Sequence, residues 1–147
     1  MASHIYSVGS STRSAAEFLA ALAAFGVRAV ADVRRFPRST RYPHFGHEAL
    51  AALLREAAAA YAWLGDDLGG YRVEGYPAYH ETAPFIRGLH RVEALARSSP
   101  TAILCAERLP WRCHRRFIAT ALRRRGWEVV HILELDRSWT PGEGQEG

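Results

Sequence analysis

Segments with the pattern of β-strands alternate with segments with the pattern of α-helices along almost the whole chain. The short apolar run HIYSVG (4–9) is typical of a buried strand, and SAAEFLAALAAFG (14–26) repeats its apolar residues at helical spacing. Ser14 followed by Glu17 is a capping box, and Gly26 is a helix stop. Strands that alternate with helices form right-handed βαβ units around a mostly parallel sheet. We therefore expect a single-domain α/β fold, a three-layer αβα sandwich with about five strands.

The rest of the chain continues this alternation. Further strands are expected at 27–33, 61–65, 101–107 and 127–135, and further helices at 47–60, 83–99 and 110–126. Residues 1–135 would then form the domain, and the Gly- and Glu-rich tail 136–147 is expected to be disordered. Two long loops, 34–46 and 66–83, remain, and compact domains rarely keep long loops without a use.

The composition limits which cellular compartment and which partners we expect for the protein. No apolar run reaches the length of about 18 residues that spans a membrane, and the N-terminus has no basic-then-apolar signal pattern. We expect a cytoplasmic protein without a membrane partner. Two cysteines are too few for a disulfide scaffold, so a reducing compartment is expected.

All 19 cationic residues are arginine, and the net charge is +4. They cluster in 28–41 and 107–125, each with a single acid. Arginine-rich codon usage accounts for much of this, and a solvated helix face accounts for 123–125. The stretch RRFPRSTRYPHF (34–45), however, interleaves arginine with aromatic residues, which suits phosphate contacts and base stacking. We therefore expect nucleic acid, DNA or RNA, as a partner.

Polar residues gather where the expected strands end. Ligands of open α/β sheets bind at this carboxyl edge. Asp32 and Arg34 share parity and leave one face of their strand, as do Cys105 and Glu107. The groups expected at this edge are Ser10, Ser11, Asp32, Arg34, Cys105, Glu107, Cys113, His114 and Arg115. The two acids are expected to face one pocket; the alternative is that each acid only pairs with a neighbouring arginine.

The hydroxyls and backbone amides of GSSTRS (9–14) precede a helix, which predicts an anion site. It lies at the same carboxyl edge as the two acids.

The two cysteines leave several alternatives open. Cys105 lies within an apolar strand, which favours a buried, inert thiol. Cys113 at a helix start, beside His114 and Arg115, is in a setting that lowers a thiol pKa. The spacing lacks the paired ligands of zinc sites, and neighbouring helical side chains diverge by about 100 degrees. No metal and no cofactor is therefore expected; a minority alternative is an ion held by Cys105, Glu107 and one of Cys113 or His114. A redox disulfide between the cysteines also stays open.

Four motifs resemble the family catalogued as domain of unknown function 488. They are IYSVGSS, DVRRFPRS, YAWLGDDLGG and ILCAERLPWRCHRRFIA, and the resemblance extends to about Leu135. It implies a compact α/β domain with a shared site made of Asp32, Arg34, Pro37, Arg38, Ser39, Leu68, Gly69, Gly70, Cys105, Glu107, Cys113, His114 and Arg115. It implies no reaction, because the family is named for lacking one.

The first functional hypothesis is a nucleic-acid-acting hydrolase of the N-glycosidic, DNA glycosylase-like type. Asp32 and Glu107 would be the paired acids, with Cys113 and His114 as supporting catalytic groups. A flipped or single-stranded base would be the substrate, and the absence of lysine predicts hydrolysis without a Schiff-base step. The residues expected to bind substrate are Ser10, Ser11, Arg34, Phe36, Arg38, Ser39, Tyr42, Phe45, Tyr71 and Arg115.

Two alternatives remain. One is a cysteine-based redox or thiol enzyme that uses Cys113 with His114 or Glu107. The other is a module that binds nucleic acid or a small anion without chemistry.

Overall fold

A six-stranded sheet forms the centre of the protein, whose structure is a computed structural model. The structure describes residues 3–35, 42–70, 75–79, 82–107, 114–134 and 137–140. The strands, in the order β3-β2-β4-β1-β5-β6, are parallel except for β6. Their bounds are β1 (His4–Gly9), β2 (Ala29–Asp32), β3 (Ala60–Trp63), β4 (Thr101–Cys105), β5 (Glu128–Glu134) and β6 (Arg137–Trp139). The prediction of a mostly parallel α/β sheet is confirmed.

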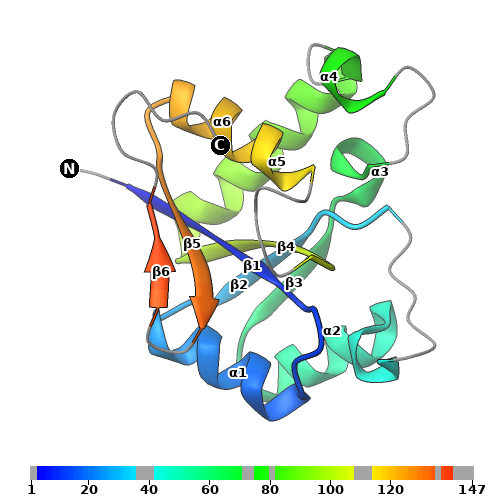
Figure 1. The fold of residues 1–147 in the computed structure, drawn as a ribbon, viewed down its shortest axis with the longest axis vertical. Helices are drawn as coiled ribbons and strands as arrows, with labels where there is room; N and C mark the ends of the chain where they lie inside the picture. The colour runs from blue at the N-terminus through cyan, green and yellow to red at the C-terminus, as the bar shows by residue number, and fades with distance from the viewer. Residues whose placement is uncertain are drawn as a thin grey trace.

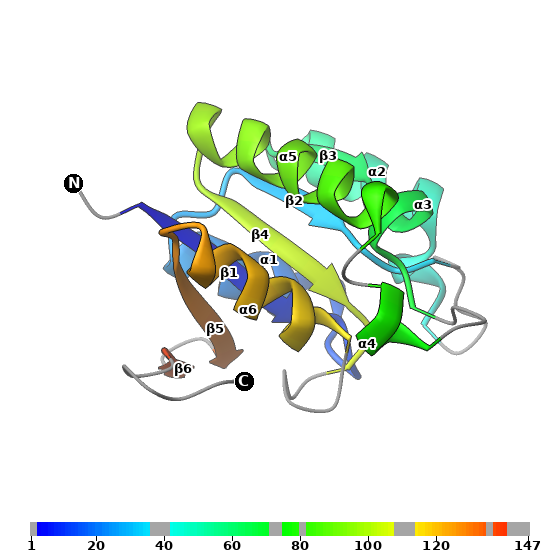
Figure 2. The same ribbon diagram turned by 90° about the horizontal axis from the view of Figure 1, so that it is seen from above.

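Helices cover both faces of the sheet, so the fold is a three-layer sandwich. Figure 1 shows α1 and α2 below the sheet and α5 and α6 above it, and Figure 2 shows the upper pair from above. The helices are α1 (Ala15–Ala24), η1 (Pro43–Phe45), α2 (His47–Glu56), α3 (Gly65–Leu68), α4 (Tyr76–Tyr79), α5 (Ala83–Ser98) and α6 (Arg115–Arg124). No helix in the described part of the chain is long and apolar enough to cross a bilayer.

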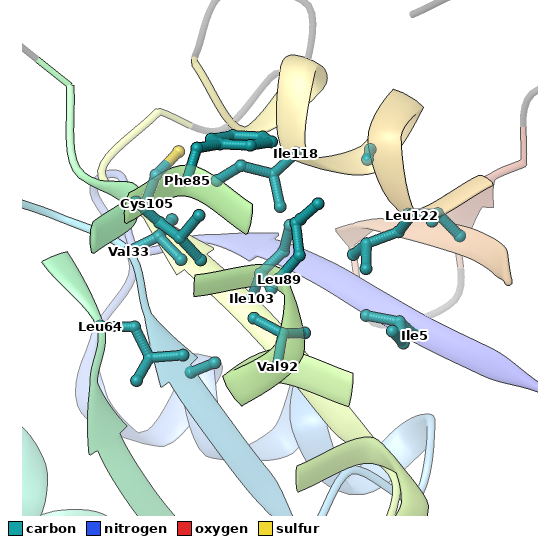
Figure 3. Packing of buried hydrophobic residues seen from close by; sticks show 14 of the residues in the cluster. Ile5, Val33, Leu64, Phe85, Leu89, Val92, Ile103, Cys105, Ile118 and Leu122 are labelled. Atoms are coloured by element: carbon teal, nitrogen blue, oxygen red, sulfur yellow. The ribbon is translucent and has the colours of Figure 1, made fainter. Parts of the chain in front are cut away.

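Two hydrophobic clusters fill the space between the layers, because alternate residues of each strand face opposite sides of the sheet. Ile5 and Ile103 face α5 and α6, whereas Val8 and Leu104 face α1 and α2. Figure 3 shows the first cluster, with Cys105 near one end and Ile5 at the other.

The helix ends follow local sequence signals. Ser14 and Glu17 form the predicted capping box. Gly26 and Gly126 follow α1 and α6 with φ values of +69° and +98°, in the left-handed region that glycine favours. The predicted start of the last helix at Pro110 lies outside the described residues.

The structure differs from the sequence prediction in short elements. The expected loops 34–46 and 66–83 contain η1 and α4, and most of α3, which are too short to show a helical period. The tail expected to be disordered contains β6, which pairs with β5. Trp139 of β6 stacks on His131 with ring centroids 5.3 Å apart, and this contact supplies an anchor that three residues alone could not.

Candidate functional site

At the carboxyl ends of β1 and β4, which are neighbours in the sheet, the connections to the next helix leave toward opposite faces. From β1 and β2 the chain continues to α1 and α2 on one face, whereas from β4 it continues to α6 on the other face. The strand ends are held together by Ser10 N, which donates to Cys105 O at 2.9 Å, and by Val33 N, which donates to Leu104 O at 2.9 Å. Such a reversal is where open α/β sheets bind ligands.

Asp32, at the end of β2, lies in a buried ion pair with Arg34. Arg34 donates from Nε to Oδ1 at 2.8 Å and from Nη2 to Oδ2 at 2.7 Å. Its Nη1 donates to Phe45 O at 2.7 Å. Burial opposes the charge of Arg34, but the hydrogen bonds and charge of Asp32 raise its pKa above the usual range. The structure therefore shows the alternative in which this acid pairs with a neighbouring arginine.

Two aromatic side chains of β3 complete this network. Tyr61 donates from its hydroxyl to Asp32 Oδ2 at 2.6 Å, and Trp63 donates from Nε1 to Arg34 O at 2.7 Å. Burial, followed by the charge of Asp32, raises the pKa of Tyr61. Sequence reasoning missed both residues, although their shared parity in YAWLG places them on one face of the strand.

Two glycines allow the chain after β3 to approach the end of β2 closely. A Cβ on Gly65 would lie 2.0 Å from Arg34 O, and a Cβ on Gly69 would lie 2.4 Å from Arg35 Cβ. The family resemblance named Gly69 and Gly70, and the structure gives Gly69 a steric reason.

Glu107 lies beyond the end of β4, where it is exposed. Its charge acts on Arg115, the first residue of α6, which is fully buried. Burial and the neighbouring cation Arg13 lower the pKa of Arg115 to about 9, and Glu107 opposes this shift. Arg13 donates to Leu133 O at 2.6 Å and to Gly9 O at 3.0 Å. Two guanidinium groups and one acid therefore meet at the ends of β1, β4 and β5. Sequence reasoning did not single out Arg13.

The structure does not bring the two predicted acids together. Asp32 pairs in register with Leu104 and faces the α1 and α2 side. Glu107 interacts with Arg115, which contacts Cys105 on the α5 and α6 side. The described residues therefore do not form the expected pocket that both carboxylates face.

Cys105 is buried, as predicted, at 1% exposure. Its sulfur is disulfide-bonded, however, so the expected free thiol is wrong. Arg115 donates from Nη1 to this sulfur at 3.2 Å. Strand pattern predicts burial, but a pattern of apolar residues carries no information on the oxidation state of sulfur.

His114 precedes α6 and is half-buried. Its Nε2 lies 3.0 Å from Val33 O, and because a carbonyl only accepts, Nε2 carries the hydrogen. The ring packs against Tyr76 with centroids 5.2 Å apart and lies beside Gly70. His114 therefore connects the start of α6 to the end of β2.

Backbone amides of the predicted anion site at 9–14 are already hydrogen-bonded within the protein. Ser10 N and Ser11 N donate to Cys105 O and Ala106 O, which extends the pairing of β1 with β4. Ser14 N donates to Glu17 Oε1. The expectation that these amides bind an anion is corrected, because strand pairing and the helix cap occupy them.

Phe45 and Tyr42 have different environments. Phe45 is 1% exposed and packs against Phe18 with centroids 5.2 Å apart. It is a core residue, so its predicted role in base stacking is corrected. Tyr42 is half-buried and packs on the same cluster. The predicted site residues that lie outside the described residues are Phe36, Pro37, Arg38, Ser39, Tyr71 and Cys113.

Ser7 and His131 form a buried polar pair that sequence reasoning missed. They lie opposite each other on β1 and β5, and Ser7 Oγ is hydrogen-bonded to His131 Nδ1. Burial, followed by the charges of Arg115 and Arg123, lowers the pKa of His131 to about 3. The ring is therefore neutral at pH 7. The sequence did contain a signal for this burial, because His131 lies two residues after the buried Val129 and therefore shares its face of the strand.

No group of three or more metal-ligating side chains occurs among the residues that the structure describes.

Comparison with known protein families identifies the family of this chain. A family model described as "Domain of unknown function DUF488" matches residues 14–122. This stretch contains β2, β3, β4 and α6 up to Leu122, whereas the resemblance of the motifs began before it and ran beyond it. No curated protein and no solved structure matches.

Proposed function

We propose, for a chain that belongs to the DUF488 family of unknown function, that it is a nucleic-acid-acting hydrolase of the N-glycosidic type. The observation that carries this proposal is the grouping of Glu107 with Arg115 and Arg13 at the carboxyl edge of the sheet. Glu107 is exposed and can reach water and substrate. Arginine charge beside an accessible carboxylate suits an anionic polymer and acid–base chemistry.

The residues would divide the chemistry as follows. Cleavage of an N-glycosidic bond leaves the bonding electron pair on the base and an oxocarbenium-like sugar. Water adds to the anomeric carbon, and the Glu107 carboxylate accepts its proton. Arg115, buried in low dielectric, supports the negative charge of the departing base or of a phosphate without touching it. Half-buried Arg13 adds to that field.

Asp32 takes a different role in this proposal from the one its sequence position suggested. Its two oxygens accept hydrogen bonds from Arg34 and Tyr61, and it is 0% exposed. A buried carboxylate with these partners is poorly placed to activate water. We therefore treat Asp32 as a positioning residue that fixes Arg34 and, through Arg34 Nη1, the carbonyl of Phe45.

A panel of modified-base oligonucleotides, single- and double-stranded, followed by alkaline cleavage, tests the proposal. We expect strand breaks after alkali with the native chain and a loss of about 100-fold or more with Glu107→Gln. Glu56→Gln makes the same change on an exposed residue at the end of α2, at the opposite edge of the sheet, and should retain activity. No binding of any strand even at low salt would overturn the proposal, because phosphate contacts are strongest there.

A cysteine-based redox or thiol enzyme is a second candidate with one observation in its favour. The disulfide-bonded sulfur of Cys105 accepts a hydrogen bond from Arg115, and a neighbouring cation stabilises a thiolate once the bond is reduced. Reduction by a graded thiol buffer, followed by alkylation and mass measurement, tests it. A bond that stays oxidised at every attainable potential would argue against this function. Strand binding without cleavage would instead favour the binding module.

A further inference from the structure

Three ring side chains at the carboxyl end of β3 form a surface that we call the aromatic corner, made of His47, Tyr61 and Trp63. His47 stands nearly perpendicular to Tyr61, with centroids 5.4 Å apart and planes at 75°. Its ring is also nearly perpendicular to that of Trp63, at 6.4 Å and 86°. His47 is exposed and the other two are half-buried. The aromatic corner therefore has an open side.

The two β3 rings are fixed by hydrogen bonds to the buried ion pair. Tyr61 donates to Asp32 Oδ2, and the Trp63 indole donates to Arg34 O. Among the described residues, Trp63 belongs to neither hydrophobic cluster, so the core does not explain its size. Rings that are already ordered lose little entropy when a ligand stacks on them.

The same network sets the tautomer of His47. Tyr61 has one hydroxyl hydrogen and gives it to Asp32. The hydrogen between Tyr61 Oη and His47 Nδ1, which are 3.1 Å apart, must then come from Nδ1. A neutral His47 therefore has its lone pair on Nε2, and no hydrogen bond of the described residues uses that atom. The exposed His47 presents an acceptor of defined direction to solvent.

We propose that the aromatic corner binds a nucleobase, which stacks on Trp63 and donates an N–H from its edge to Nε2 of His47. The choice of a nucleobase as ligand rests on the proposed function. Two nearly perpendicular planes suit a flat heterocycle that needs one face contact and one edge contact. Tyr61 is the positioning residue, since it holds the Nδ1 hydrogen of His47.

Binding of a fluorescent single strand of about ten adenylates, compared with an abasic strand of the same length at low salt, tests this proposal. Both strands offer the same phosphates, so the ratio of their affinities isolates the bases. We expect a preference of about 10-fold for the base-bearing strand. His47→Ala removes one hydrogen bond and keeps the stacking on Trp63, so it should reduce that preference by about 3-fold and leave the abasic strand unaffected. His90→Ala, at an exposed histidine of α5, should retain the preference.

Nitrogen-15 resonances of His47 at pH 8 give a readout of the tautomer. We expect an unprotonated Nε2 that shifts when the adenylate strand is added, and a mixed tautomer in Tyr61→Phe. A protonated Nε2, an absent shift, or an unchanged base preference in His47→Ala would each overturn the proposal. These results do not depend on catalysis: Glu107→Gln tests the hydrolase and should leave the affinity ratio unchanged, so either idea can fail alone.

Discussion

Two buried arginines lie on opposite sides of the sheet near the carboxyl end of β4, and their pKa values are shifted in opposite directions. On the α1 and α2 side, the guanidinium of Arg34 is joined to Asp32 by two hydrogen bonds, and its pKa is raised despite burial. On the α5 and α6 side, Arg115 is more deeply buried and contacts the sulfur of Cys105. Burial and repulsion by the charge of Arg13 lower its pKa. The same type of side chain is favoured as a cation in one place and disfavoured in the other.

This difference separates architecture from candidate chemistry. A raised arginine pKa means that the fold stabilises the charge, which is what a positioning pair requires. A lowered pKa means that the fold carries an electrostatic cost, and such perturbed groups concentrate at functional sites. The comparison therefore favours the Arg115 side for the proposed acid–base chemistry, whereas the Asp32 pair fixes the neighbouring side chains, the aromatic corner among them.

Asp32→Ala should give the largest effect on stability. It leaves the Arg34 guanidinium buried without its carboxylate, and breaking a buried pair from one side costs about 3–5 kcal/mol. Urea unfolding monitored by circular dichroism measures the change in the free energy of unfolding.

Asp66→Ala is the matched control for that experiment. Asp66 also pairs with an arginine, Arg91, at 3.0 Å, but the two side chains are 53% and 40% exposed. Exposed pairs contribute less than about 1 kcal/mol. Equal losses in the two variants would mean that the Asp32 pair is no more structural than a surface contact.

The buried His131 should make stability depend on pH. Its pKa is about 3 in the folded protein against 6.5 ordinarily, so between these values the unfolded chain binds the extra proton. The free energy of unfolding then falls as pH falls, by about 2 kcal/mol between pH 7 and pH 5. Urea midpoints across this range check the slope.

Two variants identify the source of that slope. In His131→Asn the titrating ring is gone, and most of the dependence between pH 7 and pH 5 should disappear. The exposed His90→Asn should keep it. A slope that survives in His131→Asn would show that other groups cause it.

Gly65→Ala tests the steric contact that supports the Asp32 side. The added Cβ would lie 2.0 Å from the carbonyl oxygen of Arg34, a backbone atom that cannot move aside alone. Overpacking of this kind costs about 1–3 kcal/mol. At Gly70 the added Cβ would lie 3.4 Å from His114 Nδ1, so Gly70→Ala should be nearly neutral when both variants are compared by urea unfolding. A neutral Gly65→Ala would contradict the close approach.

The sequence predicted the fold well because its signals are local. The apolar run 4–9 and the capping box of Ser14 and Glu17 each specify a few neighbouring residues. The same locality explains what was missed. The four-residue helices α3 and α4 cannot show a period, and β6 depends on the contact of Trp139 with His131.

The candidate site was predicted only in part, because the register between neighbouring strands decides which of their side chains lie together on one face of the sheet. Parity placed Asp32 with Arg34, and the two side chains do form an ion pair. It could not tell that Asp32 aligns with Leu104, which faces α1 and α2, rather than with Cys105, which faces α5 and α6. Pairing between strands distant in sequence sets this alignment, and no single strand encodes it.

Arg115→Met should affect stability less than Asp32→Ala or Gly65→Ala does, and this difference is the sharpest test of the comparison. The lowered pKa of Arg115 shows that its charge is unfavourable in the folded protein, so an apolar side chain of similar length relieves that cost. We expect the free energy of unfolding to stay within about 1 kcal/mol of the native value, whereas Asp32→Ala loses several. A loss of 3 kcal/mol or more in urea unfolding would make Arg115 a structural group like Arg34, and the contrast between the two sides would disappear.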